Sequence, residues 1–194
     1  MADNDASWTT PDGDKSRHLP MEELESKLAA LPAAPKDQGR VVALFARPGS
    51  NQRTPLGSAR LTPAKGMPGD RWSHKREGKG DPKPDQMLAT MQADIAELIA
   101  NGQPVGLFGD NLFVELDLSK ENLPLGTRVK MGDATLEVTP EPHNGCLKFK
   151  ARFGSDALRL VSRKEDRHRN LRGIYFKVVE DGEVAAGDVI EVLR

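Results

Sequence analysis

Short apolar segments separated by tight turns dominate the second half of this 194-residue chain. Five segments have the length and composition of β-strands, and they lie at 111–116, 128–131, 134–138, 175–179 and 189–192. Gly-Asp pairs, which suit the backbone angles of tight turns, recur at 69–70, 109–110, 132–133 and 187–188. Many short strands joined by such turns favour a small closed β-barrel or a curled sheet. We therefore predict a mainly β fold.

Two further strands are predicted at 41–46 and 57–62, and a polar loop rich in Gly and Pro is predicted at 73–85.

Helices are expected at fewer places. The longest helical pattern runs from about Asp85, a suitable N-cap, to Asn101, with Gly102 as a stop. The apolar residues at helical spacing are Leu88, Met91, Ile95 and Leu98. A shorter helix is predicted near 155–162, so the barrel should carry one long helix and one or two short ones.

Residues 1–38 differ from the rest of the chain. They contain prolines at 11, 20, 32 and 35, and only 19–31 has apolar residues at helical spacing. We predict that residues 1–18 are disordered and that 19–31 form a short helix. The chain would then consist of a flexible extension, 1–38, and a β-barrel domain, 39–194.

Composition excludes several classes of protein. Lys and Arg total 28 against 29 Asp and Glu, so the net charge of -1 does not indicate a globally basic nucleic-acid binder. No apolar run approaches the ~18 residues of a membrane-spanning helix, and the N-terminus lacks the apolar stretch of a secretory signal. A single cysteine excludes an internal disulfide and any multi-cysteine metal site. These features predict a cytoplasmic protein in a reducing compartment.

The segment around Cys146 carries the most chemical information. Cys146 follows the predicted strand 134–138 and a turn that contains two prolines and Asn-Gly. Lys148, Lys150 and Arg152 follow at alternating positions, so all three would share the face of Cys146 if this piece were a strand. Nearby cations favour the thiolate, which is the reactive form and the metal ligand.

Other readings of Cys146 stay open at this point. A lone cysteine is often a small buried hydrophobic residue. His143 stands three residues before it, and the pair could form a nucleophile–base dyad, although a hydrolase also needs an orienting group and an oxyanion hole. His143 and Cys146 alone offer too few ligands for structural zinc.

The region from 146 to 172 is strongly basic, with nine Lys and Arg against three Asp and Glu. Such a face suits an anionic partner, and it could also make the protein a non-enzymatic barrel module that binds a protein or nucleic acid. Nucleic acid is the less favoured partner because residues 163–172 contain no aromatic side chain for base stacking.

The glycine-rich stretch at 106–112 is a second place for ligand contacts. It lacks the Lys-Ser/Thr that follows a phosphate-binding loop. Asp110 and Asn111 are therefore either turn residues or polar contacts to a cofactor.

The order of these motifs resembles the MOSC domain, named for the C-terminal domain of molybdenum-cofactor sulfurase. The resemblance rests on Gly-Met-Pro-Gly-Asp-Arg-Trp at 66–72, Phe-Gly-Asp-Asn-Leu at 108–112, Asn-Leu-Pro-Leu-Gly-Thr-Arg at 122–128, Met-Gly-Asp-Ala-Thr-Leu-Glu-Val at 131–138, Pro-His-Asn-Gly-Cys-Leu-Lys-Phe at 142–149, Arg-Phe-Gly at 152–154, Leu-Arg-Gly-Ile-Tyr at 171–175 and Gly-Asp-Val-Ile-Glu-Val at 187–192. It runs in order from about residue 40 to residue 194. The resemblance implies a barrel-like fold and a family cysteine, here Cys146, that carries persulfide sulfur or ligates molybdenum.

Further expectations follow from this resemblance. The chain is expected to be a sulfur carrier or to bind the molybdenum cofactor (molybdopterin), either as a sulfur transferase or as a molybdenum-dependent oxidoreductase. A cysteine desulfurase would be the sulfur donor, and a molybdoenzyme a possible acceptor. In the sulfurases a separate desulfurase domain holds pyridoxal phosphate; these residues include no such domain, so pyridoxal phosphate is not expected on this chain. Many bacterial members read His-His-Gly-Gly near His74 and Gly-Glu-Asn at 109–111, where this chain reads Gly-Asp-Asn.

The resemblance also suggests roles for individual residues. Cys146 would be the catalytic thiol and the molybdenum ligand, because soft thiolates suit both tasks. The residues expected to hold the anionic pterin are Arg71, Asp110, Asn111, His143, Asn144, Lys148, Lys150 and Arg152.

Overall fold

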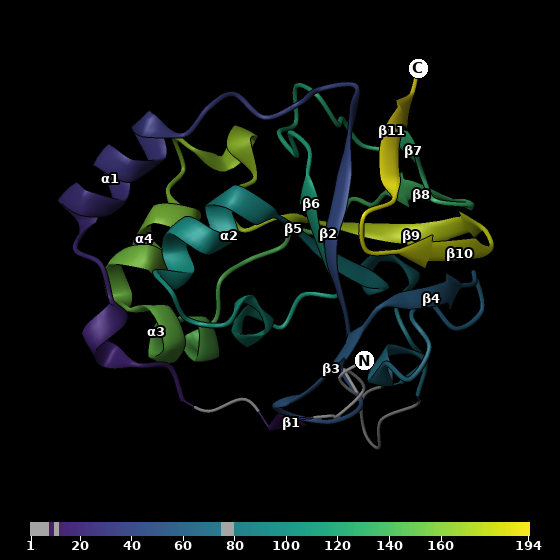
Figure 1. The fold of residues 1–194 in the computed structure, drawn as a ribbon, viewed down its shortest axis with the longest axis horizontal. Coiled ribbons are helices and arrows are strands. Elements are labelled where there is room, and N and C mark those ends of the chain that lie inside the picture. The colour runs from purple at the N-terminus through teal and green to yellow at the C-terminus, as the bar shows by residue number, and fades with distance from the viewer. Residues whose placement is uncertain (1–7, 10–11, 75–79) are drawn as a thin grey trace.

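The computed structural model describes residues 8–9, 12–74 and 80–194, and its centre is a closed barrel of seven strands (Figure 1). Around the ring the strands are β2 (Gln38–Ala46), β11 (Val189–Leu193), β7 (Arg128–Met131), β8 (Ala134–Val138), β9 (Ile174–Glu180), β5 (Leu88–Gln92) and β6 (Leu112–Glu115). Pairing of β2 with β6 closes the ring, and only β5 and β6 run parallel. Each of the seven strands thus has a neighbour on both sides within the ring, and the predicted mainly β barrel is confirmed.

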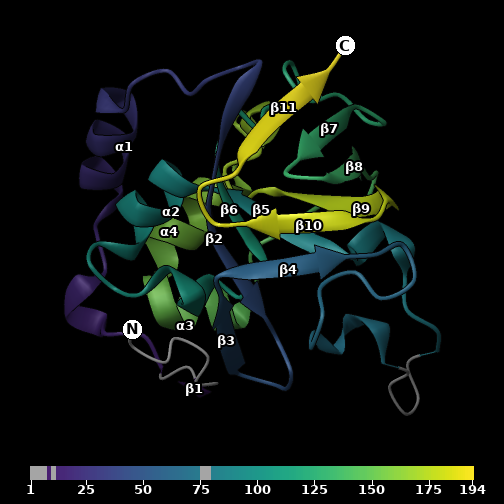
Figure 2. The ribbon, with the colours of Figure 1, turned by 45° about the vertical axis from the view of Figure 1, so that its right-hand side comes forward.

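Four more strands lie outside the ring. β3 (Gln52–Leu56) pairs with β2, and β1 (Trp8–Thr9) pairs with β3. β4 (Ser58–Leu61) and β10 (Gly182–Ala185) form a separate two-stranded sheet, which Figure 2 shows beside the barrel.

The helices gather on one side of the barrel (Figures 1 and 2). They are α1 (Met21–Ala30), α2 (Ala93–Ala100), α3 (Leu147–Phe153) and α4 (Ser155–Ser162). Single 3-10 turns occur at η1 (Lys15–Arg17), η2 (Arg71–Ser73), η3 (Pro84–Gln86), η4 (Val105–Phe108) and η5 (Arg167–Arg169). The described helices are all too short or too polar to cross a membrane.

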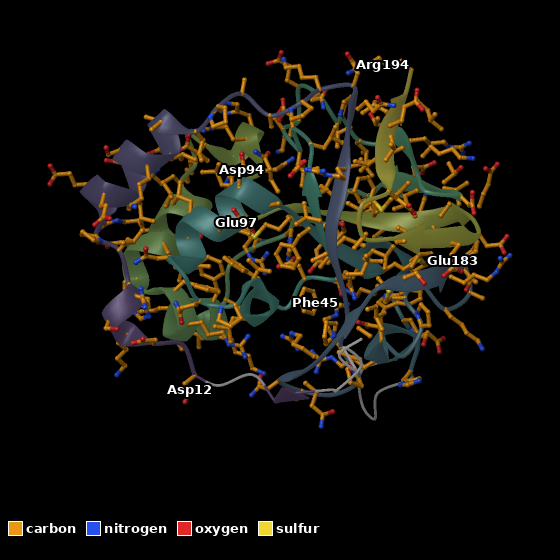
Figure 3. The ribbon with its side chains drawn as sticks, in the orientation of Figure 1. Asp12, Phe45, Asp94, Glu97, Glu183 and Arg194 are labelled. Atoms are coloured by element: carbon orange, nitrogen blue, oxygen red, sulfur yellow. The ribbon has the colours of Figure 1, made fainter. Side chains whose placement is uncertain are left out.

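Two apolar cores result from this arrangement. One fills the barrel, and the second lies between the barrel wall and the helices. In the second core the rings of Phe108 and Phe153 stack with centroids 4.0 Å apart. Phe45 from β2, labelled in Figure 3, joins the same core and meets Phe113 edge to face at 5.9 Å. The loop that precedes β6 is therefore held between barrel and helices.

Most predicted elements are present. The strands expected at 41–46, 57–62, 111–116, 128–131, 134–138, 175–179 and 189–192 correspond to β2, β4, β6, β7, β8, β9 and β11. The helices expected at 19–31 and 155–162 correspond to α1 and α4.

The helix predicted from Asp85 to Asn101 is wrong in its first half. Residues Leu88–Gln92 form β5, which pairs with β9 and β6, and helix α2 begins only at Ala93. Leu88 belongs to the barrel core and Met91 to the helical core, so the two side chains lie on opposite faces of the strand. A strand buried on both faces has no alternation of polar and apolar residues, and the spacing of its apolar residues then imitates a helix.

The segment before β2 contacts the rest of the molecule. Helix α1 buries Leu24 and Leu28 and lies against α2 and α4. Upstream, the Asp14 amide donates to Gln103 Oε1 (2.7 Å), and His18 Nε2 lies 3.1 Å from the Arg152 carbonyl oxygen. Residues 1–7 and 10–11 of the predicted disordered segment, and 75–79 of the predicted loop 73–85, lie outside the described residues. The division into 1–38 and 39–194 stays a prediction.

Candidate functional site

Four arginines from different elements surround the short loop between α2 and β6. Their guanidinium groups donate to the backbone carbonyl oxygens of four consecutive residues. The pairs are Arg53 Nε to Gly106 (3.0 Å), Arg152 Nη1 to Leu107 (2.6 Å), Arg172 Nη2 to Phe108 (3.3 Å) and Arg47 Nη1 to Gly109 (3.3 Å). The last carbonyls of a helical turn lack helical partners, and here the arginines donate to them; the Gly106 carbonyl also accepts from the Gly109 amide (3.3 Å). We call Arg47, Arg53, Arg152 and Arg172 the arginine cluster.

Gly109 allows the loop to approach the arginines. Its φ of +83° lies in the left-handed region, and a Cβ there would stand 2.5 Å from Arg53 Nη2. Only glycine combines this backbone angle with so close a neighbour.

Two carboxylates pair with the arginine cluster. Asp70 Oδ2 accepts from Arg47 Nε at 2.7 Å, and Asp110 Oδ2 accepts from Arg172 Nη1 at 2.7 Å. Both carboxylates are buried, so these pairs are screened little by solvent.

Within the described part of the chain Arg53 takes part in no ion pair, and the Asp110 carboxylate, which pairs with Arg172, offsets its charge only in part. Burial lowers the pKa of Arg53 to about 10, and the positive charges of Arg152, Arg47 and Arg71 act in the same direction. The cluster is thus an environment of excess positive charge, which suits an anionic ligand.

Asn111 ties this site to the barrel. Its Nδ2 donates to the Phe45 carbonyl (3.1 Å) and to Asp70 Oδ2 (2.8 Å), and its Oδ1 accepts from the Ala89 amide (3.1 Å). Burial acts to raise the pKa of Asp70, but the charge of Arg47 and the hydrogen bonds that Asp70 accepts bring it below the usual value. Asn111, predicted to bind a cofactor, is itself fully buried and positions the loop.

Asp110 lies at the centre of a second buried group. Burial raises the pKa of Asp110, although Arg172 opposes this. Asp110 Oδ1 stands 3.3 Å from His143 Nε2, but the two are not aligned as a hydrogen bond. The His143 ring lies 4.5 Å from the ring of Tyr175. Asp110 therefore faces protein groups and supports the site from within.

His143 is a buried, neutral imidazole. Burial lowers its pKa well below the usual 6.5, and repulsion from Arg172 and Arg47 lowers it further. A proton on Nε2 faces the Asp110 carboxylate, whereas a lone pair there would be repelled, so we assign the proton to Nε2. Nδ1 is then a bare acceptor, and it has no hydrogen-bond partner among the described residues.

This environment predicts a pH dependence of stability. As the pH falls below about 6.5, the unfolded chain binds a proton at His143 that the folded chain does not bind. The free energy of unfolding should then fall by up to about 1.4 kcal/mol per pH unit. Urea unfolding between pH 7 and pH 5 measures this slope. His143→Gln should remove that contribution, whereas His168→Gln, on the exposed turn η5, should retain it; an identical slope in both variants would contradict the assignment.

Cys146 is exposed and immediately precedes α3. The strand considered for residues 146–152 is wrong, because Leu147–Phe153 form a helix whose buried side includes Phe149, Arg152 and Phe153. Buried residues at i, i+3 and i+4 favour a helix over a strand. The exposure of Cys146 also excludes the interpretation as a buried hydrophobic residue.

The helix rearranges the predicted basic residues. Lys148 and Arg152, four residues apart, share a side, whereas Lys150 projects from another side of α3. Lys148 Nζ donates to Asn51 Oδ1 (2.9 Å), and Arg152 Nη2 donates to the same oxygen (3.2 Å). Burial lowers the pKa of Arg152, and the charges of Cys146 and Asp12 oppose this shift. Arg152 therefore lies close to Lys148 and within electrostatic reach of Cys146, whereas Lys150 does not join them.

The remaining predicted residues fall into two places. Arg71 lies beside the arginine cluster: its amide donates to the Arg47 carbonyl (3.0 Å), and its charge contributes to the low pKa of Arg53. Asn144 is exposed and, with His143, lines a separate pocket.

Two chemical alternatives find no supporting geometry. Among the described residues, the unpartnered Nδ1 of His143 makes no hydrogen bond to Cys146, so a dyad is not formed. The described part of the chain also contains no group of three or more His, Cys, Asp or Glu side chains suited to a metal ion.

The basic region 146–172 is not a single free face. Arg152 and Arg172 are buried, and three other arginines take part in ion pairs with neighbouring acids. These three are Arg159, Arg163 and Arg169.

The sequence prediction missed Arg47, Arg53, Arg172 and Asp70 as members of the site. Asp70 lies within the motif at 66–72, which was a usable signal. Arg47 and Arg53 stand in a polar stretch with no recognisable pattern, and only the pairing of β2 and β3 brings them to the 106–109 loop.

Comparison with known proteins agrees with the motif order. The family model described as "MOSC domain" matches residues 82–191. Among solved structures, YuaD from Bacillus subtilis superposes with a TM-score of 0.58 at 18% identity, covering 80% of this chain and 95% of YuaD. YiiM from Escherichia coli superposes with a TM-score of 0.52 at 20% identity, covering 80% and 70%. At these identities the superpositions establish the fold alone.

Curated relatives match over shorter segments. The Bacillus subtilis protein YflK is 31% identical over 86 residues, which are 44% of this chain and 36% of YflK. A Gibberella moniliformis protein named "Reductase" is 34% identical over 91 residues, 46% of this chain and 15% of that protein. The matched segments thus span well under half of either relative.

Proposed function

Because the chain belongs to the MOSC domain family, we propose that it is a molybdenum-cofactor-binding protein in which Cys146 supplies the metal ligand. The exposed thiol stands at the start of α3, and the same helix carries Arg152 into the arginine cluster. A soft thiolate beside a group of guanidinium ions matches the chemistry of a metal-bearing, anionic pterin.

The observation that carries this proposal is that Arg53 is buried among other arginines and has no ion-pair partner within the described residues. A buried cation without a carboxylate partner costs free energy, which an anionic ligand would recover. Burial and the charges of the neighbouring arginines disfavour the charged form of Arg53 and lower its pKa to about 10. A pterin phosphate held by the neighbouring Arg152, Lys148 and Arg71 would supply a negative charge near Arg53.

The residues that would hold the cofactor follow from these contacts. Cys146 would ligate the metal, and Arg152, Lys148 and Arg71 would attract the anionic part. Asp110 and Asn111 would keep the 106–109 loop in place rather than touch the ligand. When bound, such a cofactor supplies a redox-active metal centre. The similarity to the Gibberella protein named "Reductase" favours a reductive activity.

Persulfide carriage by the same thiol is the second candidate, and the exposure of Cys146 favours it. A carrier must present its sulfur to a donor protein, such as a cysteine desulfurase, and to an acceptor molybdoenzyme. An accessible cysteine meets this requirement, and the lone thiol makes one carried sulfur per chain the expected stoichiometry.

Native mass spectrometry of anaerobically purified protein tests both candidates. A mass gain equal to a molybdenum–pterin, absent in Cys146→Ser, is expected for a cofactor protein. A gain of one sulfur atom that a thiol reductant removes is expected for a carrier. Lys150→Gln, on another side of α3, is the matched control and should keep the adduct. A bare polypeptide mass after incubation with the cofactor, and also after incubation with a desulfurase and cysteine, would contradict both candidates.

A further inference from the structure

The turn between β2 and β3 places one side chain between two cations of the candidate site. Asn51 Oδ1 accepts from Lys148 Nζ (2.9 Å) and from Arg152 Nη2 (3.2 Å). Lys148 Nζ also donates to Ser50 Oγ (3.2 Å). Ammonium and guanidinium groups are donors only, so the atom of the Asn51 amide that faces both of them is its oxygen. One neutral oxygen thus bridges two positive charges.

The bridged cations belong to the helix that follows Cys146. Lys148 and Arg152 are four residues apart in α3, so their side chains share one side of the helix. Against the effect of burial, the charge of Cys146 raises the pKa of Arg152, which places the two groups within electrostatic reach of each other. Cys146 and Lys148 are both exposed, and Lys148 takes part in no ion pair within the described residues. An anion that approaches the thiol can therefore reach the Lys148 ammonium group.

The backbone does not dictate that residue 51 be neutral. Asn51 has a φ of +61°, in the left-handed region that Asn and Asp tolerate better than other side chains. An aspartate would fit the same turn, accept both hydrogen bonds and pair with both cations. Such a carboxylate would also offset one positive charge beside the thiol. The amide of Asn51 holds the two cations together and adds no negative charge.

We propose that Asn51 is a positioning residue that determines specificity: its neutral oxygen holds Lys148 and Arg152 beside Cys146, so that the thiol reacts preferentially with anionic partners. This inference rests on the proposed role of Cys146 as the functional thiol. It adds the chemical class of the partners, which carry a carboxylate, sulfonate or phosphate near the reacting atom. Asn51 acts through the two cations rather than by touching the partner.

Two alkylating reagents measure this preference. Iodoacetate is an anion and iodoacetamide is neutral; with either reagent the thiolate sulfur attacks the methylene carbon, a C–S bond forms and iodide leaves. Both reactions use the same thiolate, so the ratio of their rates reports the charge around Cys146 and not the fraction of ionised thiol. At low ionic strength Asn51→Asp should lower the iodoacetate-to-iodoacetamide ratio about 2–4-fold, as expected for one charge near the surface.

Two further variants make the test specific. Lys148→Gln also removes one positive charge and should lower the ratio by a similar factor. Asn101→Asp is the matched control, because Asn101 is also left-handed (φ 47°) but caps α2 and donates to the Arg17 carbonyl (3.1 Å); the wild-type ratio should be kept. In about 1 M salt, where the Debye length is about 3 Å, the difference between wild type and Asn51→Asp should shrink.

An unchanged ratio in Asn51→Asp, or an equal decrease in Asn101→Asp, would overturn the proposal. Should Asn51→Asp fail to fold, Asn51→Gly keeps the left-handed backbone and releases both cations; it should also lower the ratio, and an unchanged ratio there would contradict the proposal equally. The rates are measured on the full chain purified from molybdate-free medium. A failure here therefore leaves the cofactor proposal intact, since native mass spectrometry decides that proposal separately.

Discussion

Replacing Asp110 with alanine should lower the free energy of unfolding by about 3–5 kcal/mol, the usual cost of removing one partner of a buried ion pair. Asp110 is fully buried and accepts from Arg172 at 2.7 Å, and Arg172 itself is only 7% exposed. Without the carboxylate, a buried guanidinium would keep its charge and lose its counter-ion. The lowered free energy of unfolding should therefore come more from the uncompensated charge of Arg172 than from the missing hydrogen bond.

Urea denaturation of a small set of variants tests this account. Asp110→Asn keeps an acceptor for Arg172 without the charge, so its loss should be smaller than that of Asp110→Ala. Glu115→Ala, which removes an exposed pair with Arg40, is the control and should cost at most about 1 kcal/mol. If Asp110→Ala lowered the free energy of unfolding no more than Glu115→Ala, the Asp110–Arg172 ion pair would not be a main support of the site.

Replacing Gly173 with alanine should destabilise the protein by about 2–5 kcal/mol, because two unfavourable effects add. Its φ is +97°, where a side chain is strained. A Cβ there would also stand 2.0 Å from the Thr90 carbonyl oxygen, which belongs to the backbone of β5. Since backbone cannot rotate away, β5 and the start of β9 would have to separate.

Gly126 allows the two effects to be measured separately. Its φ is +82°, but a Cβ there would meet no atom within 4 Å. Gly126→Ala should therefore cost only the backbone term of about 1–2 kcal/mol. The difference between the two variants, from unfolding midpoints at equal slope, is the cost of the clash. An equal decrease in the free energy of unfolding at both positions would show that β5 and β9 can separate at little cost.

Several parts of the site could be predicted because they are local in the chain. The Pro and Asn-Gly turn before Cys146 indicated that this residue lies outside regular structure, and Cys146 immediately precedes α3. The Gly-Asp-Asn stretch at 109–111 indicated a turn, and Gly109 adopts a left-handed backbone there. Both features depend on the conformational preferences of neighbouring residues.

Other parts could not be predicted because two periodicities fit the same residues. In Leu147–Phe153 basic and apolar residues alternate, as in a strand, yet Phe149 and Phe153 also match a helix. The choice depends on Arg152, which is buried and reaches the Leu107 carbonyl only from a helix. In β5 the apolar spacing predicted a helix, but the segment is a strand, because its pairing with β9 and β6 buries both of its faces.

By itself, then, the amino-acid sequence determined the class of fold, the succession of short strands, the position of the lone thiol and the family motifs. These depend on periodicity and turn chemistry within a few residues. Tertiary structure alone decided that Arg47, Arg53, Arg152 and Arg172 meet on four consecutive carbonyls, and that His143 is buried beside a pocket. Long-range strand pairing and burial create these contacts. The charge balance of the arginine cluster and the desolvation of the His143 imidazole arise only when the barrel has closed.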